Sequence, residues 1–293
     1  MGKTLVDIII PSYNGLILLQ KNLPYIFKYT PNLRKVIIID NGSSDNTAAW
    51  LQKKYPQVQV IINDTNLGFT GPINQGVAVS TAKYFVLLNN DVQPLAKYIN
   101  FALDHFKTSQ NVFAVTFNEK QSSWPLLRHA NGKIQFTLGE DKTMPHFSAW
   151  ASGGSAIFSR KIWDKLGGLD EIYSPWYWED IDIGYRAWKS GYKIIWEPKA
   201  LINHHHESTS KKLNKNYVNR IKQRNELLFN WLNIQDRQYR YKHFVFLLTH
   251  TLTHPGYIIV FLSALFRYLT HRHLPRSFKY SDQAVIQHIL KTV

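Results

Sequence analysis

Short apolar runs alternate with segments of helical periodicity over the first ninety residues, and this alternation constrains the fold more than any other feature. Between the first two runs, Leu16, Leu19, Leu23 and Ile26 recur at the spacing of one helix face. Buried strands separated by helices are typical of a parallel sheet covered by helices. The pattern therefore predicts an α/β fold with a mainly parallel, Rossmann-like central sheet. We expect its first four strands at residues 5–10, 36–39, 58–62 and 84–88.

Polar residues stand where three of these strands are expected to end. The first run is followed by Pro11, Tyr13 and Asn14, the second ends at Asp40, and Asn-Asn-Asp at 89–91 follows the fourth. Each group alone is common in turns. Together they indicate a ligand site, because ligands of open α/β sheets bind at the carboxyl ends of the strands. No G-x-G-x-x-G follows the first strand, which argues against a dinucleotide-binding site.

Composition excludes several classes of protein. The chain has 293 residues, 44% of them hydrophobic, which is enough for a sizeable core and argues against disorder. It has no cysteine, so disulfides, zinc–thiolate sites and thiol nucleophiles are excluded. The N-terminus lacks a long apolar stretch of the signal-peptide type. We therefore expect a cytoplasmic protein.

Positive charge is concentrated in the last part of the chain. The formal net charge is +15, and residues 211–293 contain fourteen Lys/Arg against three Asp/Glu. Within this part, residues 243–266 carry no Lys, Arg, Asp or Glu but contain histidines and the break Pro255-Gly256. Two amphipathic helices lying on an anionic membrane surface fit this pattern better than a membrane-spanning helix. Helices that cover the core or form a homodimer interface are the alternative.

Seven segments resemble those of family 2 glycosyltransferases, in the order expected for that family and within the first 210 residues. They are I-I-I-P-S-Y-N-G (8–15), I-D-N-G-S-S-D (39–45), N-L-G-F (66–69), L-L-N-N-D-V (87–92), G-G-S-A (153–156), G-G-L-D-E (167–171) and W-E-D-I-D-I-G-Y-R (178–186). The chain is most similar to the bacterial, rhamnosyltransferase-like members that build cell-surface polysaccharides.

The resemblance implies a GT-A fold for residues 1–210, with a nucleotide-sugar half at 1–92 and an acceptor half at 93–210. It also implies a UDP- or dTDP-linked sugar donor, a saccharide or lipid-linked acceptor, and inversion at the anomeric carbon with the help of Mg²⁺ or Mn²⁺. Residues 211–293 form a basic helical extension in this scheme. We expect the protein at the cytoplasmic face of the inner membrane.

The resemblance also assigns residues to the donor. Tyr13 matches a family position that stacks on the nucleobase, and Asp40 matches one that accepts from a ring N–H. The other positions that match the donor site are Pro11, Asn14, Asn66, Gly68, Asn89 and Asn90.

The metal site departs from the family pattern. Asp91 and His204 match the metal-binding positions, but Asn89 replaces the first Asp of the family's D-x-D motif. One carboxylate with diphosphate oxygens still makes an acceptable site, since Mg²⁺ relies on substrate phosphates. We therefore expect weak affinity for the bare ion.

Asp180 matches the general base, which takes the proton of the acceptor hydroxyl. The residues that match the acceptor site are Gly153, Gly154, Trp178 and Glu179. Asp182 is expected to complement the helix dipole or to cap a neighbour.

Two other classes of protein share some of these features. A nucleotidyltransferase of related fold would need a Gly-rich, basic loop after the first strand, which residues 11–15 lack. A non-catalytic basic protein could bind nucleic acid or membrane through the C-terminal region. We expect no nucleic-acid partner, because the basic residues there alternate with a long apolar stretch instead of forming a solvated basic face.

Overall fold

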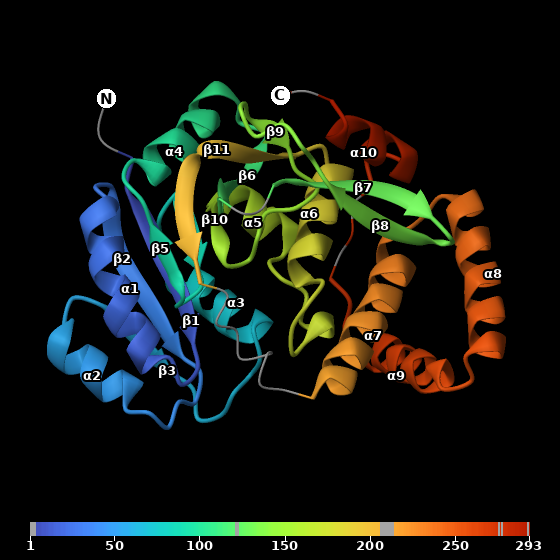
Figure 1. The fold of residues 1–293 in the computed structure, drawn as a ribbon, viewed down its shortest axis with the longest axis horizontal. Coiled ribbons are helices and arrows are strands. Elements are labelled where there is room, and N and C mark those ends of the chain that lie inside the picture. Colours follow the sequence, from blue (N-terminus) through green and yellow to red (C-terminus); the bar gives the residue numbers. More distant parts are fainter. Residues whose placement is uncertain (1–3, 121–122, 206–213, 275, 277, 292) are drawn as a thin grey trace.

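The computed structural model describes residues 4–120, 123–205, 214–274, 276, 278–291 and 293, shown in Figure 1. A nine-stranded mixed sheet runs through the molecule in the order β3-β2-β1-β4-β10-β6-β11-β5, with β9 paired to β11. The predicted domain boundary between residues 210 and 211 lies outside the described residues.

The first four strands are all parallel, as the alternating pattern predicts. The apolar runs of β1, β2 and β4, such as Ile8–Ile10 and Ile37–Ile39, are buried, whereas β3 at the edge of the sheet is only partly covered. The helices of this half lie beside the sheet in Figure 1. The elements are β1 (Val6–Ser12), α1 (Leu16–Tyr29), β2 (Leu33–Asp40), α2 (Thr47–Lys54), β3 (Gln59–Ile62), α3 (Thr70–Val79) and β4 (Tyr84–Leu88).

The second half continues the same sheet, because β10 pairs antiparallel with β4. Next to β10 lies β6, and β11 runs parallel to β6 before it pairs with the short edge strand β5. A separate hairpin of β7 and β8 lies outside the main sheet. The elements are β5 (Val92–Pro94), α4 (Tyr98–Thr108), β6 (Val112–Asn118), β7 (Pro125–Ala130), β8 (Lys133–Leu138), β9 (His146–Phe147), β10 (Ser155–Ser159), α5 (Arg160–Leu166), η1 (Glu171–Tyr173), α6 (Glu179–Lys189) and β11 (Lys193–His204).

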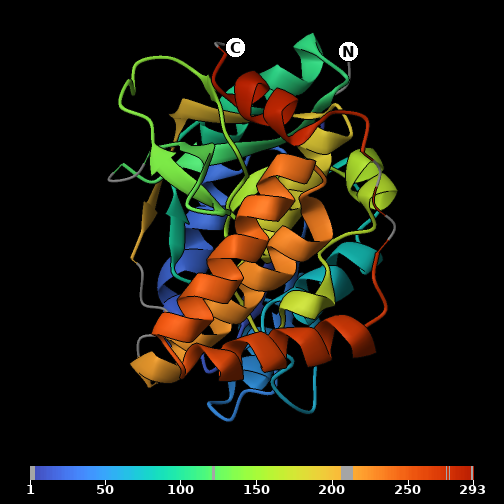
Figure 2. The ribbon, with the colours of Figure 1, turned by 90° about the vertical axis from the view of Figure 1, so that its right-hand side faces the viewer.

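The C-terminal region is helical, with α7 (Lys215–Asn233), α8 (Arg237–Thr253), α9 (Tyr257–Thr270) and α10 (Asp282–Ile289). Asn214 and Asp236 cap α7 and α8, each accepting hydrogen bonds from two backbone N–H groups of the first turn. The helical structure is interrupted between α8 and α9 at residues 254–256, where the sequence has His-Pro-Gly. Figure 2 shows α8 and α9 on the outer side of the molecule.

In the described part of the chain, no helix has both the length and the apolar character needed to cross a membrane.

Buried ion pairs attach the C-terminal region to the rest. Arg276, which follows α9, contacts Asp182 of α6 at 2.8 Å and Asp170 at 2.9 Å. Asp282 of α10 accepts from Lys189 of α6 at 2.7 Å. Asp182 is in the first turn of α6, as expected for an acid that complements a helix dipole, and it also pairs with Arg186.

Candidate active site

The carboxyl ends of β1, β2 and β4 meet at one edge of the sheet, and the structure brings their polar residues together. Ser12 accepts the backbone N–H of Asn41 at 2.8 Å, which joins the ends of β1 and β2. The Asn90 side chain, after β4, donates to Ser12 Oγ at 3.0 Å. Pro11 is the next-to-last residue of β1. The predicted donor residues that follow these strands are therefore neighbours.

Tyr13 and Asp40, the predicted nucleobase pair, differ in exposure. Tyr13 is 36% exposed just beyond β1, so part of its surface is accessible to a ligand. Asp40 is buried at the end of β2, where it accepts the backbone N–H of Ser43 at 3.0 Å. Asn14 accepts the backbone N–H of Ser44 at 2.8 Å and so connects the loops after β1 and β2.

A buried side chain that sequence reasoning missed, Asn41, organises the loop after β3. Its Nδ2 donates to Asn66 Oδ1 at 2.9 Å and to the Gly68 carbonyl at 2.8 Å, and its Oδ1 accepts the backbone N–H of Leu67 at 3.1 Å. The predicted donor residues Asn66 and Gly68 are thereby tied to the end of β2. Only its place directly after Asp40 in the turn could have indicated this role.

Gly68 also lies where the donor half meets the acceptor half. Its φ is +81°, and a Cβ there would be 2.5 Å from the carbonyl oxygen of Pro175. The next residue, Phe69, donates its backbone N–H to the same oxygen at 2.7 Å. Only glycine fits both the left-handed conformation and this close approach.

Gly154 serves a similar close approach beside β4. The backbone N–H of Asn89 donates to the Gly154 carbonyl at 2.9 Å, and a Cβ on Gly154 would lie 2.3 Å from the Asn89 amide nitrogen. The Asn89 side chain therefore rests directly on the backbone of the G-G-S-A segment. Asn89, which replaces the first Asp of the D-x-D motif, therefore lies next to the predicted acceptor residue Gly154.

His204, at the end of β11, lies between two carboxylates. Its Nε2 is 3.2 Å from Asp91 Oδ1, and its Nδ1 is 3.1 Å from Glu119 Oε1. Burial lowers the pKa of His204, but the hydrogen bonds to Asp91 and Glu119 outweigh it and raise the pKa to about 9. The ring is therefore cationic at neutral pH. The structure brings the two predicted metal ligands together.

Glu119 is the second residue that sequence reasoning missed. It directly follows β6. Residues after β1, β2 and β4 were predicted because they follow a strand, and Glu119 would have been predicted in the same way if the apolar run 112–118 had been recognised as a strand. Glu119 also accepts a hydrogen bond from Ser155 Oγ at 2.7 Å, which links it to β10.

The residues at this position fit a divalent cation only in part. Carboxylate oxygen and imidazole nitrogen suit Mn²⁺, and carboxylate oxygen suits Mg²⁺. Among the described residues, however, no three His, Asp or Glu side chains are arranged to hold a metal ion. Asp91 and His204 would thus supply two ligands and the diphosphate others. The ion would also have to displace the proton that His204 carries.

Asp180 and Glu179 open α6 and face different surroundings. Asp180 is partly buried and accepts backbone N–H groups from Ile181, at 2.9 Å, and from Gly153. Burial raises its pKa to about 6, although these hydrogen bonds act in the opposite direction. Glu179 is fully buried, and its Oε2 has no hydrogen-bond partner among the described residues. Burial, and then the charge of Asp180, raises the pKa of Glu179 well above its ordinary value.

The loop before Asp180 has an unusual backbone, with Tyr177 at φ +71° and Trp178 at φ +78°. The Trp178 ring packs on Phe229 of α7, with ring centroids 5.1 Å apart. Asn225 of α7 donates to the carbonyls of Tyr173, Trp176 and Tyr177 at 2.7–3.0 Å. The C-terminal region therefore shapes the loop that leads to the predicted base.

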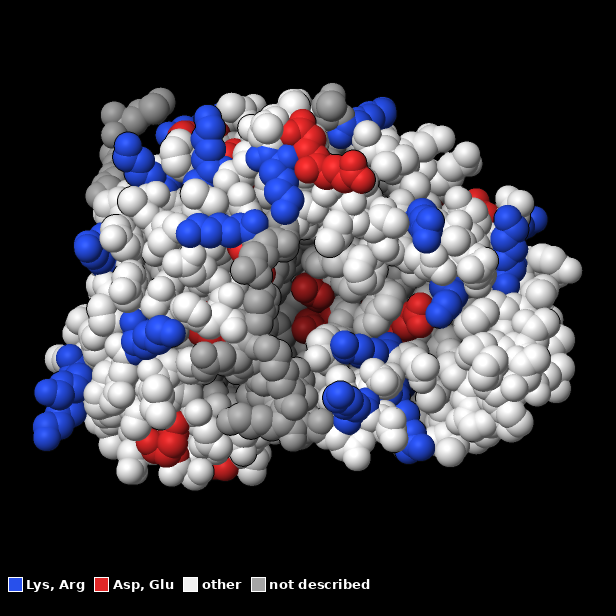
Figure 3. Space-filling view, in the orientation of Figure 1, with Lys and Arg blue, Asp and Glu red and all other residues white. Residues whose placement is uncertain are grey.

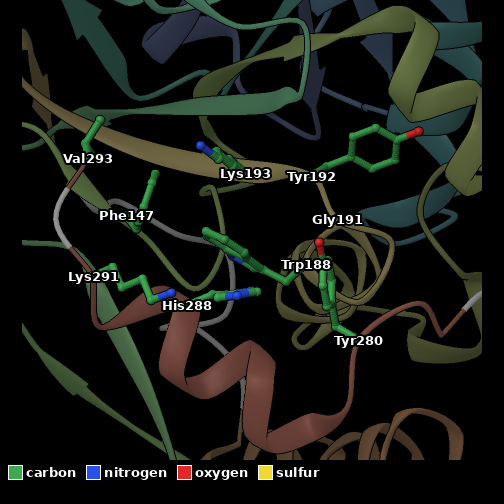
Figure 4. Close-up of a pocket in the computed structure, with 9 residues that line it drawn as sticks. All are labelled: Phe147, Trp188, Gly191, Tyr192, Lys193, Tyr280, His288, Lys291 and Val293. Carbon is green, nitrogen blue, oxygen red and sulfur yellow. The ribbon is translucent and has the colours of Figure 1, made fainter.

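A hollow with acidic side chains inside it opens near the centre of the face in Figure 3, around the start of α6 in Figure 1. A different pocket, of about 390 Å³, lies between the α6–β11 turn and α10. Trp188, Lys193, Tyr280 and His288 line it, and Figure 4 shows their side chains around it. It contains none of the predicted site residues.

Comparison with known families identifies the class. Residues 7–167 match the family model for glycosyl transferase family 2, and residues 127–281 match that for glycosyl transferase family group 2. The first match covers more than half of the chain, so the protein belongs to glycosyl transferase family 2, and the predicted family is confirmed.

Individual relatives are more distant. An N-acetylglucosaminyl-diphospho-decaprenol L-rhamnosyltransferase of Mycobacterium tuberculosis (strain CDC 1551 / Oshkosh) is 25% identical over 203 residues, which are 58% of this chain and 66% of the relative. A poly-beta-1,6-N-acetyl-D-glucosamine synthase of Staphylococcus aureus (strain COL) is 26% identical over 211 residues, 67% of this chain and 48% of the relative. The chain thus spans less than two thirds of the length of either protein.

Two solved structures share the fold. GalNAc-T7 with UDP, GalNAc and Mn²⁺ superposes with a TM-score of 0.67 at 14% identity, covering 82% of this chain and 49% of that one. The mannosyltransferase PcManGT from Pyrobaculum calidifontis, in complex with GDP-Man and Mn²⁺, gives a TM-score of 0.57 at 17% identity, covering 94% and 78%. The GT-A fold, with C-terminal helices, is confirmed.

Proposed function

We propose that this protein is an inverting hexosyltransferase that moves a sugar from a nucleoside-diphosphate sugar to a hydroxyl of a saccharide or lipid-linked acceptor, in the synthesis of cell-surface polysaccharide. The observation that carries the proposal is the grouping of polar residues at the ends of β1, β2 and β4, with Asp180 across the junction formed by Gly68 and Pro175. Family membership and the rhamnosyltransferase relative support it.

The donor base binds between Tyr13 and Asp40 in this proposal. The half-exposed Tyr13 ring offers a stacking face, and the buried Asp40 carboxylate accepts a ring N–H. Uracil and thymine both present such an N–H, whereas cytosine presents an acceptor at the same ring position. This pairing favours a UDP- or dTDP-linked sugar over a CDP-linked one.

Asp180 is the proposed general base. Its carboxylate takes the proton of the acceptor hydroxyl while that oxygen bonds to the anomeric carbon, and the bond from this carbon to the diphosphate oxygen breaks with its electron pair on the diphosphate. A single displacement of this kind inverts the anomeric configuration. The backbone N–H of Gly153 holds the Asp180 carboxylate in place, since it donates to it.

Asp91 and His204 would hold the divalent cation together with the diphosphate. When bound, Mg²⁺ or Mn²⁺ neutralises the charge that develops on the leaving diphosphate. The two related folds were solved with Mn²⁺, which supports this assignment. Glu119 contacts Nδ1 of His204 and so fixes the orientation of the ring, while Nε2 faces Asp91.

Calorimetric titration with UDP, dTDP, GDP and CDP, each with and without Mn²⁺ or Mg²⁺, tests the proposal. We expect UDP or dTDP to bind in the presence of metal and CDP to bind far more weakly. Tyr13→Ala should weaken binding roughly 5–100-fold, since aromatic stacking on a base contributes about 1–3 kcal/mol. Tyr25→Ala, at a tyrosine of α1 with similar exposure (39%), is the matched control. No binding by any diphosphate would overturn the proposal.

A further inference from the structure

The outer faces of α8 and α9 carry a row of large apolar side chains that are exposed in the described part of the chain. On α8 the exposed positions recur at intervals of three or four residues, and the same is true of α9. We call these residues the outer apolar face. They are Tyr241, Phe244, Val245, Leu248, Leu252, Ile258, Ile259, Leu262, Phe266 and Leu269.

The opposite sides of the same helices are already used for packing. On α8, His243 is buried and hydrogen-bonds through Nδ1 to the Gly132 carbonyl at 2.7 Å. On α9, Val260 and Ala264 are buried, and Phe261 packs edge-on against Trp231 of α7. Each helix therefore has one fixed orientation. The residues of the outer apolar face are exposed on the sides of the helices away from this packing, and Figure 2 shows both helices on the outer side of the molecule.

The charges around this face have one sign. From residue 237 to residue 281 the chain has seven Lys/Arg and no Asp or Glu. Arg237, Arg240 and Lys242 are exposed at the start of α8, and Arg272 is exposed just after α9. In Figure 3 the lower right part of the molecule, where α8 ends, carries no charge, and basic side chains lie toward the start of α8.

We infer that the outer apolar face docks on an anionic lipid bilayer, with α8 and α9 lying in the plane of its surface. A bilayer offers hydrocarbon to the apolar side chains and anionic headgroups to the basic residues beside them. A second copy of the chain fits less well, because neither helix carries an Asp or Glu that could pair with these basic residues.

Docking in this orientation also places the loop before Asp180, residues 171–178, beside the membrane. Arg267 of α9 donates to the carbonyls of Glu171, at 2.8 Å, and of Ile172, both in η1. The loop from η1 leads through Trp178 to Asp180. A lipid-linked acceptor would therefore reach Asp180 from the bilayer without leaving it.

Co-sedimentation of the full chain with vesicles tests the inference, and needs neither donor nor acceptor. One set of vesicles is phosphatidylcholine alone and the other contains phosphatidylglycerol as well. The test variant is Leu252→Glu/Phe266→Glu/Leu269→Glu, at positions 71–73% exposed, where new carboxylates should not disturb the fold. Ile17→Glu, 78% exposed on α1, is the control, and circular dichroism checks each variant.

We expect the wild type and Ile17→Glu to bind the anionic vesicles, and the triple glutamate variant to bind at least about a hundredfold more weakly. Arg237→Gln/Arg240→Gln/Lys242→Gln should lose the preference for phosphatidylglycerol. A folded triple glutamate variant that sediments like the wild type would overturn the inference. A wild type that binds neither kind of vesicle would also overturn it. If light scattering then showed a wild-type dimer that the triple glutamate variant does not form, the outer apolar face would be assigned to contact with a second copy.

Discussion

Asp180 and Glu179 are adjacent in the chain, yet the protein gives their carboxyl groups different acidities. Asp180 has a pKa of about 6 and keeps two backbone donors, whereas burial raises the pKa of Glu179 well above its ordinary value. Two acids with separated pKa values allow one to act as a base while the other stays neutral. This assignment leads to two predictions at the scale of single residues.

The first concerns the pH dependence of transfer. Asp180 accepts a proton only when it is ionised, so kcat/KM should rise about tenfold per pH unit up to about pH 6 and level off above it. Of the neighbouring acids, Glu179 has a pKa that burial raises well above its ordinary value, and Arg186 and Arg276 balance the charge of Asp182. Initial rates at limiting donor measure the profile. A rate that does not change between about pH 5 and about pH 7 would contradict it.

The second concerns stability. The folded protein raises the pKa of Asp180 above its ordinary 3.8, so the ionised side chain lowers the free energy of unfolding above about pH 6. Asp180→Asn should therefore raise the free energy of unfolding at neutral pH by about 1–3 kcal/mol. Urea titration measures this difference in the free energy of unfolding. Asp104→Asn, in an exposed pair with Lys107, is the control and should change it by no more than about 0.5 kcal/mol. A less stable Asp180→Asn variant would show that the ionised carboxylate is structural.

Residues that follow a predicted strand could be placed from the sequence, and others could not. Asn89, Asn90 and Asp91 are found because the run before them is apolar and short. Asn41 directly follows the second predicted strand, but its partners at 63–68 could not be found in this way, because they belong to a loop whose path depends on the folded sheet.

Among the elements, α7 holds the loop that leads to the base. Asn225 is buried, and its single amide group donates to three carbonyls of residues 173–177. Arg224 donates to a fourth, that of Ser174, at 2.6 Å. These bonds stabilise a stretch in which two non-glycine residues take left-handed conformations, which is unfavourable without such support. Asn225 is thus a positioning residue for Asp180.

Replacing Asn225 should affect catalysis more than donor binding. Asn225→Ala leaves the three carbonyls without their donor, so we expect kcat to fall about 10–100-fold while the Kd of the nucleoside diphosphate changes less than about twofold. Asn219→Ala, at an exposed asparagine on the same helix, is the control. Equal losses in kcat and in diphosphate affinity would instead point to general unfolding of the region.

Element prediction succeeded where the signal is local. Residues 84–88 form a strand as predicted, and the break at Pro255-Gly256 separates two helices. The strand at the end of the acceptor half continues well beyond the apolar residues near its start, because β11 pairs irregularly as far as His204. Pairing with β6 and β5, far away in sequence, extends it.

At the scale of the whole molecule, the catalytic and C-terminal parts are joined through buried charges. Asp182 contacts Arg186 and Arg276 and accepts hydrogen bonds from Tyr173 and Asn233. Burial opposes its ionisation, but Arg276 and Arg186 lower its pKa to about 2. The contact between Asp182 and Arg276 spans 94 residues, so no local pattern could predict it.

Asp182→Asn should therefore destabilise the protein strongly. It leaves the buried Arg186 without its carboxylate and Arg276 with Asp170 alone, and we expect the free energy of unfolding to fall by about 3–5 kcal/mol at neutral pH. Because folding lowers the pKa of Asp182 below 3.8, its contribution is complete above that pH and is lost as the pH falls toward 2. Thermal unfolding at several pH values measures both effects. A variant as stable as the wild type at pH 7 would contradict the proposed role of the pair.

The most direct test of the proposed mechanism compares the wild type and Asp180→Asn in two assays with the diphosphate that binds in the calorimetric titration. We predict that sugar transfer from the corresponding donor falls at least about a thousandfold in the variant, while the Kd of the diphosphate with Mn²⁺ stays within about twofold. Transfer at a wild-type rate would show that Asp180 is not the base. Loss of diphosphate binding would show that it supports the donor site instead.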